Sequence, residues 1–118
     1  MPRFEKSNCV FCRIIAGELK SDILYQDEDV VVVRDINPSA PIHLLVLPRA
    51  HITSLRAEST EGERLLGHLI HVGSEVAQRE GVEQSGYRLI LNSGPDSGQE
   101  IAHVHLHVLG GQRLSRLG

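Results

Sequence analysis

Five short segments rich in β-branched and aliphatic residues predict β-strands, and turn residues separate most of them. These segments span residues 23–26, 30–34, 43–47, 86–92 and 104–109. A turn of three acidic residues, 27–29, separates the first two segments, and a proline-rich loop, 37–41, precedes the third. Because strands joined by short turns pair in antiparallel fashion, the pattern favours an antiparallel sheet.

Two further segments carry apolar residues at helical spacing. In the longer one, Thr60 and Glu63 match a capping box at the start, and Gly81 is suited to the left-handed conformation that ends a helix. Ser7 or Asn8 is expected to cap the shorter one, which extends to residue 15. The apolar positions of the longer helix recur every three or four residues: Leu65, Leu66, Leu69, Ile70, Val72, Val76 and Ala77. One long helix inserted among tightly connected strands predicts an α+β fold rather than a doubly wound parallel sheet.

Length and composition exclude several classes of function. The 118 residues fit one domain, 1–118, with tails at 1–7 and 112–118. A net charge of −3 and only four aromatic residues argue against binding of long nucleic acids through phosphates or stacked bases. Residues 1–9 lack the apolar core of a signal peptide, and no apolar run approaches the roughly 20 residues of a membrane helix. We therefore expect a cytoplasmic protein that binds neither nucleic acid nor membrane.

Three of the seven histidines alternate with apolar residues near the C-terminus. In a strand, His103, His105 and His107 project from one face, roughly 6.6 Å apart, and the apolar residues between them turn to the other face. A solvated polar face would explain the alternation, although threonine, lysine or serine would serve there equally well. A site in which all three histidines bind a metal is a further alternative, because His-x-His is also a ligand spacing.

This histidine motif, residues 103–109, resembles the signature of the histidine-triad (HIT) nucleotidyl hydrolases and transferases. Residues 8–18 are similar to the family's N-terminal helix, residues 35–43 to its nucleoside-binding segment, and residues 65–69 and 108–111 to its Hint branch. The resemblance implies a HIT-like α+β fold with a five-stranded antiparallel sheet, a main helix and a short N-terminal helix. It also implies a homodimer in which the main helix and a neighbouring strand pair across a two-fold axis. Gly67 and Gly73 would permit close approach of that helix, either across the axis or within the chain.

The resemblance also implies a reaction. His105 would attack the α-phosphate of a purine nucleotide and form a nucleotidyl-histidine intermediate, which water then hydrolyses. His107 and His43 would contact the phosphate oxygens. The expected substrate is a nucleoside 5'-phosphoramidate or a related conjugate of AMP or GMP. The alternatives are a dinucleoside polyphosphate hydrolase and a nucleotide-binding or interaction protein with only residual catalysis.

Further residues are implied to bind the ribose, the phosphate and the base. Asp35 would accept the ribose hydroxyls, and Asn92 and Gly98 would lie at the phosphate. The residues expected around the base are apolar: Val10, Phe11, Ile14 and Ile36. Without the resemblance, Asp35 would be a turn residue, residues 94–98 a simple turn, and the apolar residues ordinary core.

Two features depart from the resemblance. Two residues after Gly98, where the Hint pattern has a serine that helps protonate the leaving amine, this chain has Glu100. A carboxyl group there would donate a proton only if burial kept it protonated, and otherwise it would repel the phosphate. The tail at 112–118 lacks the tryptophan that close relatives present near the partner subunit's site, so the leaving-group preference is expected to differ.

The spacing Cys9-x-x-Cys12 is typical of a metal or redox site. A closed zinc site needs two more ligands, for which His51 and His103 are candidates, and some HIT relatives resemble this arrangement. One structural zinc ion per chain would then bind His103 and leave His105 free for chemistry. Two ordinary buried thiols, or a redox pair, are the alternatives.

Overall fold

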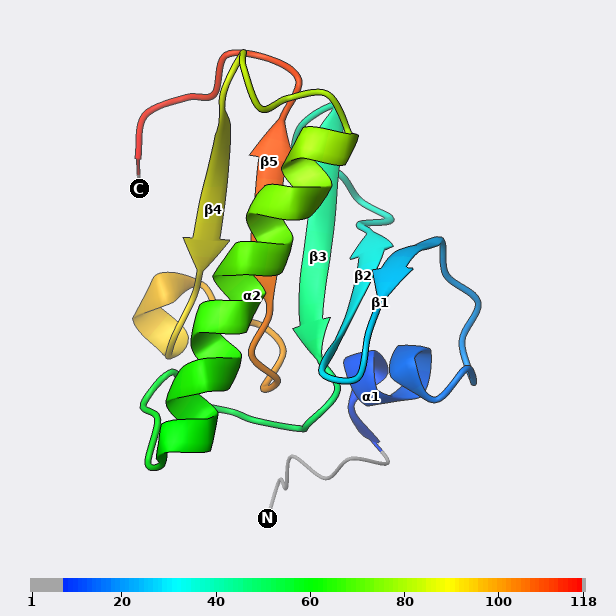
Figure 1. Cartoon of the computed structure of the whole chain (residues 1–118), viewed down its shortest axis with the longest axis vertical. Helices are drawn as coiled ribbons and strands as arrows, with labels where there is room; N and C mark the ends of the chain where they lie inside the picture. The colour runs from blue at the N-terminus through cyan, green and yellow to red at the C-terminus, as the bar shows by residue number, and fades with distance from the viewer. Residues whose placement is uncertain (1–7, 118) are drawn as a thin grey trace.

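The structure, a computed structural model, describes residues 8–117 and contains one antiparallel sheet (Figure 1). Its strands lie in the order β1-β2-β3-β5-β4. Their bounds are β1 Ile23–Gln26, β2 Val30–Arg34, β3 Ile42–Pro48, β4 Tyr87–Leu91 and β5 Leu106–Gly110. All four strand pairings are antiparallel. The predicted five-stranded antiparallel sheet is therefore confirmed, and each predicted strand end is correct to within two residues.

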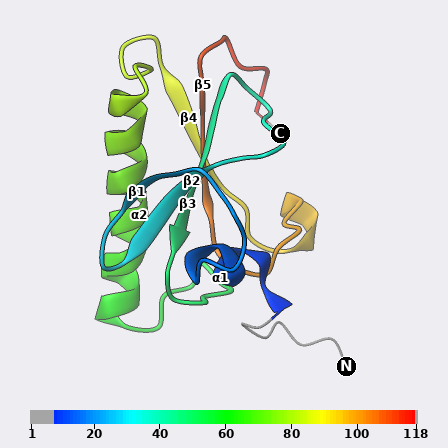
Figure 2. The same cartoon turned by 90° about the vertical axis from the view of Figure 1, so that its right-hand side faces the viewer.

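The sheet separates two apolar layers. Helix α2 (Thr60–Arg79) covers one face, and helix α1 (Val10–Ile15) lies on the other side (Figure 2). The four buried valines of β2 divide between the layers, because Val30 and Val32 pack in the cluster under α2 whereas Val31 and Val33 pack with Phe11 of α1. This is the alternation of a strand buried on both faces. Within residues 8–117, no helix is long and apolar enough to cross a membrane.

The capping box predicted at the start of α2 is wrong by one residue. Ser59 is the N-cap, and its Oγ accepts a hydrogen bond from the Gly62 N–H at 3.0 Å. Because Gly62 occupies the third helical position, it has no side chain to return a hydrogen bond to the cap, as a capping box requires. At the other end of α2, Gly81 has a φ of +80°, which confirms the predicted helix stop.

Two glycines of α2, Gly67 and Gly73, occupy different environments. A Cβ on Gly73 would lie 2.8 Å from Leu106 Cδ2, so the close approach that Gly73 permits is between α2 and β5 of the same chain. A Cβ on Gly67 would meet nothing within 4 Å among the described residues. The backbone of α2 therefore lies directly on the side chain of Leu106, the residue between His105 and His107.

Helix α1 begins at a cysteine. Cys9 is its N-cap, and the Cys9 Sγ accepts a hydrogen bond from the Cys12 N–H at 3.4 Å. The predicted cap at Asn8 is therefore wrong, and the alternative, Ser7, lies outside the described residues. Capping by Cys9 places both thiols on the first turn of α1, facing the segment that enters β5.

Candidate active site and metal centre

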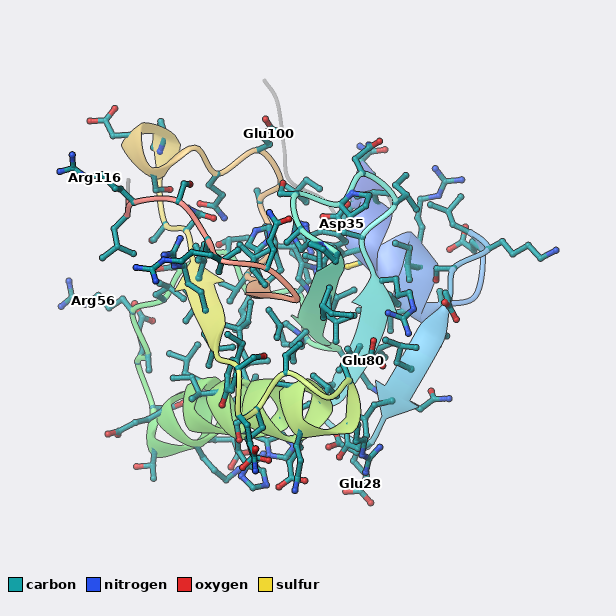
Figure 3. All side chains as sticks on the ribbon, turned by 90° about the horizontal axis from the view of Figure 1, so that it is seen from above. Glu28, Asp35, Arg56, Glu80, Glu100 and Arg116 are labelled. Atoms are coloured by element: carbon teal, nitrogen blue, oxygen red, sulfur yellow. The ribbon has the colours of Figure 1, made fainter. Side chains whose placement is uncertain are left out.

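A cleft of about 730 Å³ opens on the face of the sheet opposite α2, between α1, the loop after β2 and the loop before β5. Asp35 and Glu100 both lie on this side of the molecule (Figure 3). The cleft is lined by all eleven residues expected to act on or bind the nucleotide: Val10, Phe11, Ile14, Asp35, Ile36, His43, Asn92, Gly98, Glu100, His105 and His107. Segments far apart in the sequence therefore form one concave site, which is the arrangement expected of a binding site for a small molecule.

Strand pairing brings His43 and His107 together. In the register of β3 and β5, Leu45 lies opposite His107, so His43 is the diagonal neighbour of His107 on the same face. The Ser39 N–H donates to His43 Nδ1 at 2.9 Å, so the proton of the neutral His43 ring is on Nε2. That Nε2–H lies 2.9 Å from His107 Nδ1, which accepts it, and the His107 proton is therefore on Nε2. The backbone thus fixes the tautomers of two rings in series.

Both of these rings are neutral at pH 7. Burial lowers the pKa of His43, and the nearby carboxylate of Asp35 opposes this effect. Burial, together with the neighbouring rings of His105 and His43, lowers the pKa of His107 to about 4. Each neutral ring offers one N–H donor and one acceptor, so His107 can donate its Nε2–H to an anion in the cleft.

His105 is held in the opposite tautomer. Its Nδ1 lies 2.8 Å from the backbone oxygen of His103, which can only accept, so the ring proton is on Nδ1 and Nε2 keeps its lone pair. The ring of Phe11 packs edge-on against the His105 ring with centroids 4.8 Å apart. The centroids of the His105 and His107 rings are 4.9 Å apart, with a similar angle between the ring planes. A buried, oriented imidazole with an unprotonated Nε2 is chemically suited to nucleophilic attack.

The loop between β4 and β5 forms another wall of the cleft. It contains a single 3-10 turn, Pro95–Ser97, flanked by Gly94 and Gly98, whose φ values of +87° and +85° explain the glycines. The side-chain amide of Asn92 donates to the Ser97 carbonyl at 2.9 Å, and the Gly98 N–H donates to the Pro95 carbonyl at 3.0 Å. The Gly98 N–H is thus used within the turn.

The residues after that turn carry backbone donors without a protein partner. Within residues 8–117, the backbone N–H groups of Gln99 and Glu100 donate to no protein acceptor, and both residues line the cleft. The Glu100 side chain is exposed. Unpaired N–H groups beside a cleft are suitable donors to a phosphate.

Two thiols and two imidazoles meet behind the triad. Cys9 Sγ lies 3.3 Å from His103 Nδ1, and Cys12 Sγ lies 3.2 Å from His51 Nδ1. These four ligand atoms all lie within 4.8 Å of one another. His103 Nε2 lies 2.9 Å from the carbonyl oxygen of Pro48, to which it donates, so the Nδ1 lone pair faces the thiols.

The chemistry of this group fits a metal. Two thiols that form no disulfide, with two imidazole Nδ1 atoms, are the donor set of a tetrahedral Cys₂His₂ zinc centre. The buried His51 Nε2 has no hydrogen-bond partner within residues 8–117, so the polar contact of this ring is the one from its Nδ1 to Cys12, while its edge packs against the His103 ring. The alternative in which His103, His105 and His107 share one metal does not match this arrangement, because His103 turns its Nδ1 toward the thiols.

A second group of possible metal ligands, Asp35, His43 and His107, is explained by hydrogen bonding instead of metal binding. Donor atoms of Asp35, His43 and His107 also lie within 4.8 Å of one another. His43 Nε2 and His107 Nδ1, however, face each other at hydrogen-bonding distance, and Asp35 Oδ2 lies 3.4 Å from His43 Nε2. A hydrogen bond between the two rings, with the Asp35 carboxylate beside it, therefore accounts for this group.

Sequence reasoning missed two of the atoms that orient the rings. Ser39 and Pro48 act through a backbone N–H or C=O, which every residue type carries, so no sequence signal could have identified them. It also missed Gln99, whose side chain bonds to the loop on which it lies. The sequence signal that could have identified Gln99 is its position in a glycine-rich loop just before the triad.

Comparisons with known proteins give a consistent result. The family described as "Scavenger mRNA decapping enzyme C-term binding" matches residues 8–116. The chain is 45% identical over 105 residues to the purine nucleoside phosphoramidase of Escherichia coli (strain K12), covering 89% of this chain and 88% of the relative. It is 39% identical over 115 residues to the 14 kDa zinc-binding protein of Zea mays, covering 96% of this chain and 89% of the relative.

Solved structures agree with the sequence relatives. The HIT family hydrolase from Clostridium thermocellum matches with a TM-score of 0.87 and 41% identity, covering 93% of this chain and 96% of that chain. The fold, the histidine-lined cleft and these matches define the class of protein as a small α+β hydrolase. The chain belongs to the histidine-triad (HIT) family.

Proposed function

We propose that this hydrolase cleaves nucleoside monophosphate conjugates at the α-phosphate, with His105 as the nucleophile. The observation that carries the proposal is the hydrogen bond from His105 Nδ1 to the His103 carbonyl, because it leaves the lone pair on Nε2. No side-chain base is then needed to activate the ring.

The reaction would proceed in two displacements. His105 Nε2 attacks the phosphorus, the P–N or P–O bond to the leaving group breaks, the leaving group takes a proton from solvent, and the nucleotidyl group is carried on the ring. Water then attacks the same phosphorus and gives up a proton to solvent, the P–Nε2 bond breaks, and the nucleoside monophosphate leaves with the ring restored. His107, with its Nε2–H and lowered pKa, would donate a hydrogen bond to the phosphate oxygens while itself remaining neutral at pH 7. His43 would hold His107 in that tautomer.

The walls of the cleft suit a purine nucleoside. Ile36 is 88% exposed and Val10 is 38% exposed, so apolar surface is available to cover a base. Asp35 lies at the rim with Oδ1 accepting from the Asn37 N–H, and its carboxylate would accept the ribose hydroxyls. The relative from Escherichia coli, a purine nucleoside phosphoramidase, supports a phosphoramidate of AMP or GMP as substrate.

Parallel assays separate this proposal from its alternatives. Wild-type protein and His105→Ala are incubated with an AMP amide of a primary amine and with a dinucleoside polyphosphate. We expect turnover of the amide by the wild-type protein and its loss in His105→Ala. Preferred turnover of the polyphosphate would favour the second activity, and binding of AMP without turnover of either compound would favour a nucleotide-binding protein. Equal rates in both proteins would refute the role of His105.

We also propose one structural zinc ion per chain, held by Cys9, Cys12, His51 and His103. The gathered donor set and the zinc-binding relative from maize support it. When bound, zinc would cross-link α1 to the segments after β3 and before β5. Elemental analysis is expected to find about one zinc per chain, with both thiols protected from alkylation until a chelator is added. Absence of metal together with freely reactive thiols would remove this proposal.

We infer that the active protein is a homodimer that pairs through α2 and a neighbouring strand. On α2, Ile70 is 49% exposed and Gly67 has open space beside it, so this face could accept a second copy. Analytical ultracentrifugation is expected to find twice the chain mass. A monomer at assay concentration with full activity would refute the inference.

A further inference from the structure

The side chain of Gln99 ties together the two ends of the loop between β4 and β5. Its Oε1 accepts a hydrogen bond from the Gly94 N–H at 2.8 Å, and its Nε2 donates to the Ile101 carbonyl at 3.1 Å. Gly94 begins the loop's 3-10 turn, whereas Ile101 lies two residues before His103. One carboxamide therefore joins the turn to the segment that enters the triad.

The two hydrogen bonds of Gln99, which we call the brace, each connect to other parts of the site. The Gly94 carbonyl accepts from Ser97 Oγ at 2.6 Å, so pinning Gly94 also fixes the turn that Asn92 holds from the other side. The Ile101 carbonyl accepts from the His103 N–H at 2.9 Å as well as from Gln99. Movement of the Gln99 side chain would thus disturb the turn and the start of the triad together.

The brace spans the part of the loop that has unpaired donors. The backbone N–H groups of Gln99 and Glu100 lie between the two bonded ends and have no protein partner within residues 8–117. Unpaired donors stay in one orientation only if the chain around them is fixed, and a loop with two positive-φ glycines has little rigidity of its own. The Gln99 carboxamide supplies that constraint from within the cleft wall.

We propose that Gln99 is a positioning residue for the reaction: its carboxamide fixes the loop so that the donors of the loop face the phosphate. The role rests on the proposed nucleotidyl hydrolase function. Glutamine is required because the two contacts need an acceptor and a donor on the same group. Methionine has a similar length and neither function, and glutamate keeps the acceptor while losing the donor.

Gln99→Met tests the proposal, with Gln84→Met as the matched control, because Gln84 is an exposed glutamine in the turn between α2 and β4 and does not line the cleft. The first readout is hydrogen exchange of the Gly94 amide, measured by NMR. Loss of its acceptor is expected to speed exchange about five- to tenfold in Gln99→Met, and exchange is expected to be unchanged in Gln84→Met. Gln99→Glu retains the acceptor and is expected to fall between them.

The second readout distinguishes contacts to the phosphate from contacts to the nucleoside by comparing the binding of AMP and adenosine. Gln99→Met is expected to bind AMP at least about fivefold more weakly while binding adenosine as tightly as the wild-type protein, because only AMP carries the phosphate. With an AMP amide, kcat is expected to fall about tenfold or more, with a smaller rise in KM. A merely structural role would weaken AMP and adenosine binding together.

The outcomes distinguish this proposal from the function on which it rests. Unchanged AMP binding and kcat in Gln99→Met, or equal weakening of AMP and adenosine, would overturn the role of Gln99. A wild-type protein that neither binds AMP nor cleaves its amides would instead refute the proposed function. If Gln99→Met does not fold, Gln99→Glu decides, because unchanged AMP binding and kcat there would show that the bond to Ile101 does not position the loop.

Discussion

Replacing Gly73 by alanine tests how closely α2 packs on the strand that carries the histidines. The added Cβ would lie 2.8 Å from Leu106 Cδ2 and 3.3 Å from Leu89 Cδ2, closer than side chains normally approach. Leu106 is 1% exposed and belongs to the apolar cluster under α2, so a shift of its Cδ2 displaces neighbouring core side chains. Overpacking of this kind costs about 1–3 kcal/mol, and alanine's better helix propensity returns about 1 kcal/mol. The net change in the free energy of unfolding is therefore a loss of roughly 0–2 kcal/mol.

Gly67→Ala isolates the steric part of this effect. A Cβ at Gly67 meets nothing within 4 Å on the same helix, so this variant keeps only the propensity gain of about 1 kcal/mol. Urea denaturation followed by circular dichroism is expected to place Gly73→Ala about 1–3 kcal/mol below Gly67→Ala. Each variant is measured at two protein concentrations, so that any effect of dimer formation at Gly67 becomes visible. Equal free energies of unfolding for the two variants would refute the packing described for α2.

Three further predictions follow from the caps, the buried ring and the exposed carboxylate. Ser59→Ala is expected to lose about 1 kcal/mol in urea denaturation and Thr60→Ala less than about 0.5 kcal/mol, whereas the reverse order would place the cap at Thr60. The pKa of His107 is about 4 in the folded protein against 6.5 in the unfolded chain, so the unfolded state binds more protons between these values. The free energy of unfolding is therefore expected to fall by at most about 3 kcal/mol as the pH drops from 6.5 to 4, and to fall less in His107→Gln. Identical pH dependence of stability in the wild-type protein and His107→Gln would contradict a buried neutral ring. Because Glu100 is exposed, Glu100→Ser is expected to change the rate of amine release less than about threefold, and a larger loss would identify Glu100 as the proton donor.

The fold could be predicted because its signals are local and repeated. The strands were identified to within two residues, since β-branched runs and turn residues each report on a few neighbouring positions. The helix starts were less accurate for a physical reason. Ser59 and Thr60 are both competent caps, and only the course of the chain into α2 decides between them. Cys9 caps α1 through its thiol, which is not among the preferred capping side chains.

Part of the candidate site could also be predicted from the sequence, and part could not. Side chains with distinctive chemistry, such as the two cysteines and the alternating histidines, could be assigned to groups before the fold was known, and the structure brings them together. The tautomers of His43, His103 and His107 could not be predicted. They depend on whether the chain presents the Ser39 N–H or the Pro48 carbonyl to a ring, and that is set by strand register and loop path.

Mass spectrometry of the protein during turnover tests the central claim most directly. Wild-type protein is mixed with an AMP amide, quenched in acid-free denaturant to preserve a phosphorus–nitrogen bond, and digested. We predict a covalent adenylyl group on the peptide that contains His105, formed at the rate of the first displacement and absent in His105→Ala. Turnover without any adduct at His105, or an adduct on another residue, would contradict the account.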